Sequence, residues 1–297
     1  MKADEYDAFL KDPSDFGFRV ITPRTVGAAE PLKDFAPLST FLGTPMSLTI
    51  PFARKEMRDA FKKIIAAGEE MERQRKILDK FNQEAREMGF PEGRSGMGIA
   101  PFDVIGDFLR GTEGTAIDMF RQPEKLLEAI DMITEMNLKR LLANPGHMVS
   151  FPLHKGDDTF MSRKQFERFY WPSLKKTIDA LIEEGIMVSL FAEGAYNERL
   201  EYIGDFSKGW VSWAFDKTDM AKAKKMIGDR CCISGNVPGS VVITGTPRQV
   251  KEACRKLIET CAPGGGYILA GGCTATETRN PGNFRAFMEA AREYGTY

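Results

Sequence analysis

Short apolar runs alternate with amphipathic segments over the last two thirds of the chain. We expect strands in the apolar runs at 148–154, 186–192, 210–215, 231–236 and 267–270, with a short strand or loop at 96–102. The segments between them have helical spacing and begin with helix-start signals, such as Pro123 in a first turn and Ser162 or Thr246 as an N-cap. Strands that alternate with helices at this spacing predict a parallel sheet with crossover helices, in about six such units.

The first ninety residues follow a different pattern. Prolines interrupt residues 1–50, which we expect to be irregular, and a long amphipathic pattern from Ala53 to Met88 predicts one helix or two in sequence. Only Phe18–Ile21 and Met46–Ile50 are weak strand candidates here. A closed (β/α)8 barrel needs eight strands. Either these two segments close the barrel, or the chain lacks an N-terminal part of it. We therefore predict an irregular and helical segment at 1–90 that packs on a (β/α) barrel at 91–297.

The charge and composition of the chain limit the classes of partner and of metal site that we expect. The 297 residues carry a net charge of −1, which gives no electrostatic reason to expect nucleic acid or an anionic membrane. No apolar run approaches the roughly eighteen residues of a membrane-spanning helix. The N-terminus is acidic and polar, unlike a secretory signal, so we expect a cytoplasmic protein. Five cysteines without a Cys-x-x-Cys pair and only two histidines mean that any metal site must use Cys and carboxylate ligands.

Two polar residues at predicted strand ends are the first candidates for chemistry. Glu193 ends the run that starts at Ile186, and Cys273 ends the run that starts at Gly266. The carboxyl ends of strands are where a (β/α) barrel builds its active site. Glu193 would be a metal ligand or acid–base group, or else a helix cap or ion-pair partner. Cys273 would be a metal ligand or a small buried side chain.

Further candidates follow two other predicted strands. His154 and Asp157 belong to a polar cluster after the strand at 148–154, and Asp216 follows an aromatic strand. Each could act as an acid or base or contact a substrate, and His154 could also be a structural histidine. Asp103 could be a catalytic residue or a helix cap.

Several motifs resemble the uroporphyrinogen decarboxylase superfamily, which includes porphyrin decarboxylases and cobalamin-dependent methyltransferases that share one barrel. The matching stretches are Ala100–Asp103, Leu109–Gly111, Asp118–Glu124, Leu153–Asp158, Ser162–Phe166, Phe215–Asp216, Gly235–Pro238, Gly245–Val250, Gly265–Cys273, Asn283 and Tyr294–Gly295. The resemblance implies a (β/α)8 barrel and assigns Gly235 and Asn236 to cofactor contacts.

The two branches of this superfamily differ in their site residues. The decarboxylase branch holds substrate carboxylates with an N-terminal arginine-containing segment, which this sequence does not have. The methyltransferase branch binds zinc through a His-x-Cys pair and a Cys after the last strand. Those positions are here Phe191, Glu193 and Cys273, and His154 would replace the ligand missing at Phe191.

The stretch Phe191–Leu200 resembles the O-demethylase type of methyltransferase, which moves a methyl group from a methoxylated molecule to a corrinoid protein. Zinc bound by Glu193, Cys273 and His154, or a protonated acid, would activate the leaving heteroatom, and cobalamin on the partner protein would accept the methyl group. Asp157 and Asp216 would orient the substrate. Two alternatives stay open: a porphyrinogen decarboxylase, and a non-catalytic subunit that docks a corrinoid protein.

Overall fold

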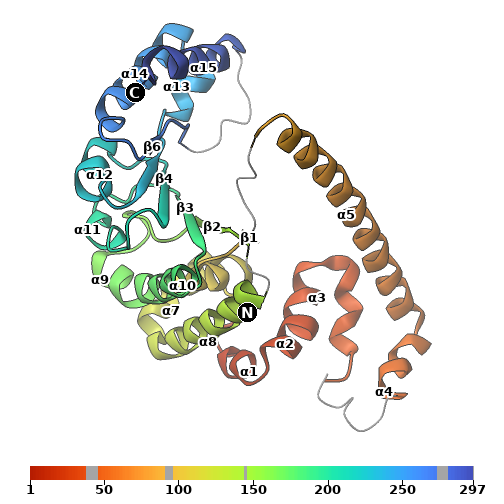
Figure 1. Ribbon diagram of the computed structural model, residues 1–297. Helices are drawn as coiled ribbons and strands as arrows, with labels where there is room; N and C mark the ends of the chain where they lie inside the picture. Colours follow the sequence, from red (N-terminus) through yellow and green to blue (C-terminus); the bar gives the residue numbers. More distant parts are fainter. Residues whose placement is uncertain (38–45, 91–95, 144–145, 273–279, 297) are drawn as a thin grey trace. The chain divides into compact units, whose positions relative to one another are not determined.

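A computed structural model describes residues 1–37, 46–90, 96–143, 146–272 and 280–296 of the chain (Figure 1). The chain forms two compact units. The first comprises Met1–Gly93 and Asp107–Ala129, and the second comprises Arg94–Gly106 and Ile130–Tyr297.

The first unit is helical in its described residues. Its helices are α1 (Tyr6–Lys11), α2 (Pro13–Phe16), a π-helical segment (Gly17–Ile21), α3 (Thr22–Thr25), a 3₁₀ segment (Gly27–Asp34), α4 (Met46–Thr49), a second 3₁₀ segment (Ile50–Ala53), α5 (Lys55–Glu87) and α7 (Thr112–Arg121). A π-helical segment, Val104–Leu109, and α8 (Pro123–Ala143) each run from one unit into the other.

The N-terminal prediction was wrong in two respects. Residues 1–37 are mostly helical rather than irregular, and the weak strand candidates Phe18–Ile21 and Met46–Ile50 are helical. The prolines explain the first error, because Pro13 lies in the first turn of its helix, where the missing N–H costs no hydrogen bond. Asp12 caps the same helix by accepting a hydrogen bond from the Asp15 N–H at 2.9 Å.

Helix α5 is a single helix, which settles the choice between one helix and two. Its first turns are buried: Met57 packs with Leu32 and Phe35, and Phe52 and Phe61 lie against the same cluster. The ring centroids of Phe52 and Phe61 are 4.7 Å apart in an edge-to-face arrangement. Beyond this cluster, nearly all of the helix is exposed.

The second unit contains a six-stranded parallel sheet in the sequential order β1-β2-β3-β4-β5-β6. Its strands are β1 (Gly96–Met97), β2 (Met148–Leu153), β3 (Met187–Ala192), β4 (Val211–Phe215), β5 (Cys232–Ser234) and β6 (Tyr267–Ile268). All five predicted strands are present, and 96–102 contributes a short strand. Sequential parallel strands with helical crossovers are the arrangement of a (β/α) barrel. The predicted architecture is confirmed for these six strands, and ring closure is not seen among the residues that the structure describes.

The two faces of this sheet carry different side chains. One face is apolar and buried, with Phe151, Leu190, Trp213 and Ile233 among its members. Helices cover this face (Figure 1), and the Trp213 indole N–H donates to the Ile203 carbonyl of α11 at 3.1 Å. The other face is lined mainly by small or polar residues that are half-buried or buried: Ser150, Pro152, Ser189, Ala214, Cys232 and Ser234.

Helices of the second unit lie between and after its strands. They are α6 (Pro101–Asp103), α9 (Arg163–Gln165) with a π-helical continuation (Phe166–Tyr170), α10 (Trp171–Glu183), α11 (Leu200–Ile203), α12 (Met220–Ile227), α13 (Gly239–Thr244), α14 (Pro247–Cys261) and α15 (Gly282–Tyr294). Ser162 and Thr246 cap their helices, and each forms a reciprocal capping box with a glutamine three residues on. No described helix is both long and apolar enough to cross a lipid bilayer.

Candidate active site

The sheet register places three of the predicted site residues next to one another. Leu153 pairs with Ala192, and Ala192 pairs with Phe215, all on the apolar face. The ladder continues one residue further, because the Glu193 N–H donates to the Leu153 carbonyl at 3.3 Å and the Asp216 N–H donates to the Ala192 carbonyl at 3.3 Å. Side chains alternate along a strand, so His154, Glu193 and Asp216 follow at neighbouring positions directed to the small-residue face. We call these three residues the edge row.

Glu193 lies at the centre of the edge row. Its side chain is half-buried, and no described residue forms a hydrogen bond or ion pair with its carboxylate. Its main chain is held by the sheet on one side and by Gly194 on the other. Gly194 has a φ of +83°, a conformation that a side chain would strain. A fixed backbone with an uncommitted carboxylate suits Glu193 to proton transfer or to ligand binding.

Asp216 supports the loop that carries Glu193. Its Oδ2 accepts a hydrogen bond from the Gly194 N–H at 3.2 Å, and the Lys217 N–H donates to the Gly194 carbonyl at 2.9 Å. The two strand ends are therefore tied together directly behind the Glu193 side chain. This contact gives Asp216 a positioning role, and its predicted role toward a substrate stays a prediction.

His154 is anchored by Asp103, a contact that the sequence did not predict. Asp103 is fully buried, and its Oδ2 accepts hydrogen bonds from the His154 main-chain N–H at 2.9 Å and from the Tyr170 hydroxyl at 2.8 Å. Burial, and then the nearby Asp103 carboxylate, raise the pKa of Tyr170 well above its usual value, so the hydroxyl stays protonated and donates. Asp103 is thus not a helix cap, and no local sequence pattern links it to His154. The imidazole itself is exposed.

Asp157 organises the loop after β2. Its Oδ1 accepts from the Phe160 N–H at 3.0 Å, and its Oδ2 accepts from the Thr159 N–H at 3.3 Å and from the Thr159 hydroxyl. The carboxylate also packs against Gly194, where an added Cβ would lie 2.7 Å from Oδ2. These contacts hold the loop in place, and the predicted role of Asp157 in orienting a substrate stays a prediction.

Arg199 holds the same loop from beneath and was also missed by the sequence analysis. The side chain is 1% exposed, and its guanidinium donates to the carbonyls of Gly156, Asp157 and Met161. It also forms an ion pair with Asp158 at 3.4 Å and lies 4.6 Å from the centroid of the Phe166 ring. Its charge is therefore satisfied internally rather than presented to the edge row.

Gly235 and Asn236 are built into the strand end after β5. Gly235 has a φ of +116°, and an added Cβ would lie 2.5 Å from the Phe215 carbonyl oxygen. Its carbonyl accepts from the Tyr267 hydroxyl at 2.5 Å, and the Asn236 amide donates to the Thr218 carbonyl at 2.7 Å. These contacts explain why a glycine is needed there. A cofactor contact at either residue stays a prediction.

The expected zinc ligands are only partly described. His154 and Glu193 lie in the edge row, but Cys273 lies outside the described residues. Within the described residues, no three His, Cys, Asp or Glu side chains converge in a way that could hold a metal ion. The described side chains alone therefore do not complete a zinc site.

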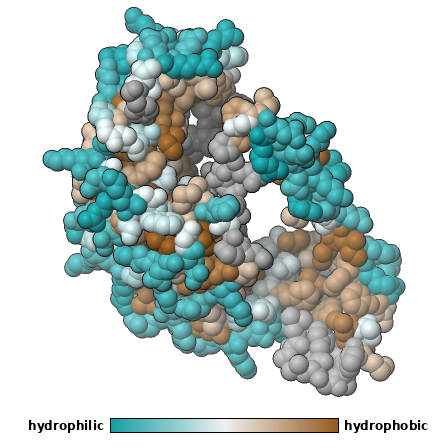
Figure 2. All heavy atoms as spheres, viewed as in Figure 1, coloured by the Kyte–Doolittle hydropathy of each residue, from teal (hydrophilic) through white to brown (hydrophobic). Residues whose placement is uncertain are grey.

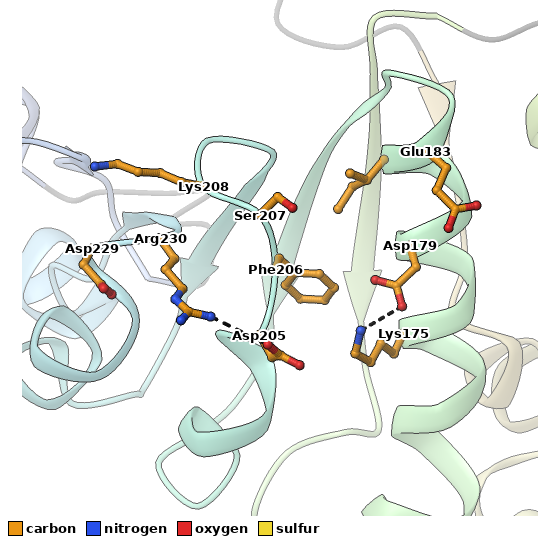
Figure 3. Close-up of a pocket in the computed structure, with 10 residues that line it drawn as sticks. Lys175, Asp179, Glu183, Asp205, Phe206, Ser207, Lys208, Asp229 and Arg230 are labelled. Carbon is orange, nitrogen blue, oxygen red and sulfur yellow. Dashed lines mark hydrogen bonds and ion pairs between the residues drawn. The ribbon is translucent and has the colours of Figure 1, made fainter.

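The large cavity in Figure 3 lies away from the edge row. It has a volume of about 900 Å³ and is lined by residues that precede the strands, such as Asp205, Phe206 and Arg230. Two ion pairs join charged groups of its lining: Lys175 with Asp179 at 2.7 Å, and Arg230 with Asp205 at 3.6 Å. The amino ends of barrel strands serve stability rather than catalysis. We therefore place the candidate site at the edge row and not in this cavity.

Comparison with known proteins identifies a family whose model matches most of the chain. Residues 94–294 match the family described as uroporphyrinogen decarboxylase (URO-D). The chain is 23% identical over 161 residues to a uroporphyrinogen decarboxylase of Sodalis glossinidius (strain morsitans), covering 51% of this chain and 43% of that protein. It is 24% identical over 179 residues to that of Klebsiella pneumoniae (strain 342), covering 58% and 48%. The chain thus spans about half the length of these curated relatives.

A solved structure with the same fold is a methyltransferase from Methanosarcina mazei. The match has a TM-score of 0.57 at 19% sequence identity and covers 71% of this chain and 62% of that one. At this identity the likeness establishes the fold alone. It agrees with the parallel (β/α) arrangement of the second unit.

Proposed function

Because the chain belongs to the uroporphyrinogen decarboxylase (URO-D) family, we propose that it is an enzyme that moves a methyl group from a small methylated molecule to a corrinoid protein. A methoxylated aromatic is the substrate class that we favour. One solved structure that shares its fold is a methyltransferase, which supports this choice within the family.

The observation that carries the proposal is the acidic edge row. Glu193 and Asp216 lie at neighbouring strand ends, and Arg199, an arginine in the described part of the loops beside them, is buried against carbonyl groups. A porphyrinogen carries several carboxylates, which are held by fixed cations. The edge row contains the carboxylates of Glu193 and Asp216 instead. It suits an uncharged substrate that needs a proton better than it suits a polyanion.

In the proposed mechanism Glu193 is the general acid. An ether oxygen is a poor leaving group until it is protonated, so the Glu193 carboxyl would deliver a proton to that oxygen as its bond to the methyl carbon breaks. The products are the free alcohol or phenol and the ionised Glu193 carboxylate. Asp216 would hold the Gly194 N–H and so keep the Glu193 backbone in place. A reduced corrinoid on a partner protein would supply the nucleophile that takes the methyl group.

Zinc is the second way to activate the same oxygen. If Cys273 joins Glu193 and His154 as a ligand, the ion would polarise the leaving oxygen as a Lewis acid. Glu193 is required in both versions, and it is therefore the residue to test first.

The test is a methyl-transfer assay with the full chain, free cob(I)alamin and a panel of methoxylated aromatics, read by loss of the cob(I)alamin absorbance and by release of the phenol. We expect Glu193→Gln to lower the rate at least ~100-fold, the lower end of what a general acid contributes. The matched control is Glu198→Gln, which removes an exposed carboxylate from the same loop, 3.8 Å from Lys222. This control should keep the wild-type rate.

Two outcomes would overturn the proposal. One is a Glu193→Gln variant as active as the Glu198→Gln control. The other is a wild-type chain that is inactive with every methoxylated substrate but releases carbon dioxide from a porphyrinogen, which would favour the decarboxylase alternative.

A further inference from the structure

Helix α5 carries a continuous apolar seam beyond the first unit's core. Starting at Met57, the positions of this seam are spaced alternately three and four residues apart, so that the pattern repeats every seven residues. They are Met57, Ala60, Ile64, Ala67, Met71, Gln74, Leu78, Phe81, Ala85 and, at the C-cap, Met88. Gln74 is the single polar member. A repeat of 3.5 residues is the signature of a two-stranded coiled coil rather than of a helix that packs on a globular core.

The seam is exposed over most of its length. Met57 and Ala60 are buried in the first unit, but Met71, Leu78 and Phe81 are each at least 60% exposed. Most of the remaining helix surface is charged, with Ile65 and Ile77 as exposed apolar residues outside the seam, and Figure 2 shows one face of α5 that is predominantly hydrophilic. A continuous row of exposed apolar residues beside a mostly charged surface marks an interaction surface.

From this seam we infer that the chain dimerises through α5, as a parallel, in-register coiled coil with α5 of a second copy. The segment from Ile64 to Met88 would span about 37 Å at the helical rise of ~1.5 Å per residue. The proposal concerns the first unit and does not depend on the proposed enzymatic activity.

Gln74 argues for the parallel, in-register arrangement. In that arrangement Gln74 faces Gln74 of the second copy, and the two amides can hydrogen-bond to each other inside the seam. In an antiparallel pairing centred on the exposed segment, Gln74 would face Leu78 and would lose hydrogen bonds on burial. A single polar layer of this kind commonly fixes register and strand number.

The charges beside the seam agree with this arrangement. If Met71 and Leu78 occupy a positions of the heptad, Glu70 occupies a g position and Arg75 an e position. In a parallel coiled coil, the g residue of one helix contacts the e residue five positions later on the other helix. Glu70 would thus meet Arg75 of the second copy, once on each side. Within one chain Glu70 now pairs with Arg73 at 2.6 Å, and Arg75 pairs with Glu72 at 2.9 Å and Asp79 at 3.4 Å. These pairs are exposed, so exchanging them for contacts between chains costs little.

The first test measures association of the full chain by sedimentation velocity over a range of concentrations. We expect a concentration-dependent dimer, and we expect Leu78→Asp to weaken it at least ~100-fold, because two charges would face each other in the seam. The matched control is Ile65→Asp. Ile65 is 59% exposed and Leu78 is 60% exposed, but Ile65 lies outside the seam. The control should dimerise as the wild type does.

The second test concerns orientation. Under oxidising conditions Gln74→Cys should form a disulfide-linked dimer in high yield, whereas Gln83→Cys, on the opposite side of the helix, should not. A wild-type monomer at all concentrations would overturn the inference and would indicate that the seam packs within its own chain. Equal dimerisation of Leu78→Asp and Ile65→Asp would also overturn it, as would a dimer that Gln74→Cys fails to link.

Discussion

Replacing Arg199 with methionine tests whether the loop after β2 depends on a buried charge. The guanidinium is 1% exposed, pairs with Asp158 at 3.4 Å and donates to three main-chain carbonyls. Methionine keeps much of the aliphatic volume but donates no hydrogen bond. The substitution therefore leaves Asp158 as a poorly compensated charge and three carbonyls without a donor.

The expected loss is large because the site is buried. Breaking a buried ion pair by removing one partner costs about 3 to 5 kcal/mol. At roughly 2 to 4 °C per kcal/mol for a unit of this size, the melting temperature should fall by about 6 to 20 °C. Arg163 provides the matched control: it pairs with Glu167 at 3.3 Å and lies 5.1 Å from the Tyr202 ring centroid, but it is 55% exposed. Arg163→Met should cost no more than about 1 kcal/mol.

The assay is urea unfolding followed by tryptophan fluorescence, since Trp171 and Trp213 both lie in the second unit. Adding Asp158→Asn to Arg199→Met should restore part of the lost stability, because it removes the uncompensated charge. Equal losses for the two arginine variants would refute this reasoning. A double variant less stable than Arg199→Met alone would refute it too.

Three further predictions can be checked on purified protein. Gly194→Ala should lower the unfolding free energy more than Gly185→Ala. Both glycines have a positive φ, which costs an alanine about 1 to 2 kcal/mol. Only the Cβ at 194 would meet another residue, Asp157, at 2.7 Å. Equal unfolding free energies would contradict this. Burial raises the pKa of Cys231 to about 12 and those of Cys254 and Cys261 to about 11, so in native protein at pH 8 iodoacetamide should modify half-buried Cys232 before these three thiols. Peptide mass spectrometry would contradict this if any of the three reacted as fast as Cys232. Protein purified without chelator should contain about one zinc per chain, lost in Cys273→Ser and kept in Cys232→Ser, and a zinc-free wild type would rule out the metal version of the mechanism.

Periodicity predicted the second unit better than the first. Apolar runs of five to seven residues gave the strands β2, β3 and β4, because a parallel strand covered by helices must be apolar. The same rule failed for Phe18–Ile21 and Met46–Ile50, since a segment of four or five residues with three apolar positions fits a helical turn as well as a strand. Prolines were read as loop signals, although a proline in the first turn of a helix is equally compatible with the sequence.

For the candidate site, the sequence predicted the strand-end positions of the residues but not their contacts. Glu193, His154 and Asp216 were predicted from their positions after apolar runs, and the register brings them to neighbouring strand ends. The contact from Asp103 to His154 joins residues 51 positions apart, and the contacts from Arg199 reach back about forty positions. No periodicity encodes such pairings, because they depend on how the crossover helices place distant loops.

Side-chain alternation connects the stability of the sheet to the placement of the edge row. Phe215 is buried on the helix-covered face, so Asp216 must leave the strand on the other face, and the same holds for Ala192 and Glu193. A register shift of one residue would turn the carboxylates into the apolar core and expose the aromatic side chains. The free energy gained by burying the apolar face therefore fixes the strand register and, with it, the face on which the edge row lies. Substituting the half-exposed Glu193 should change chemistry with little loss of stability, whereas changes at Trp213 or Phe215 should reduce both.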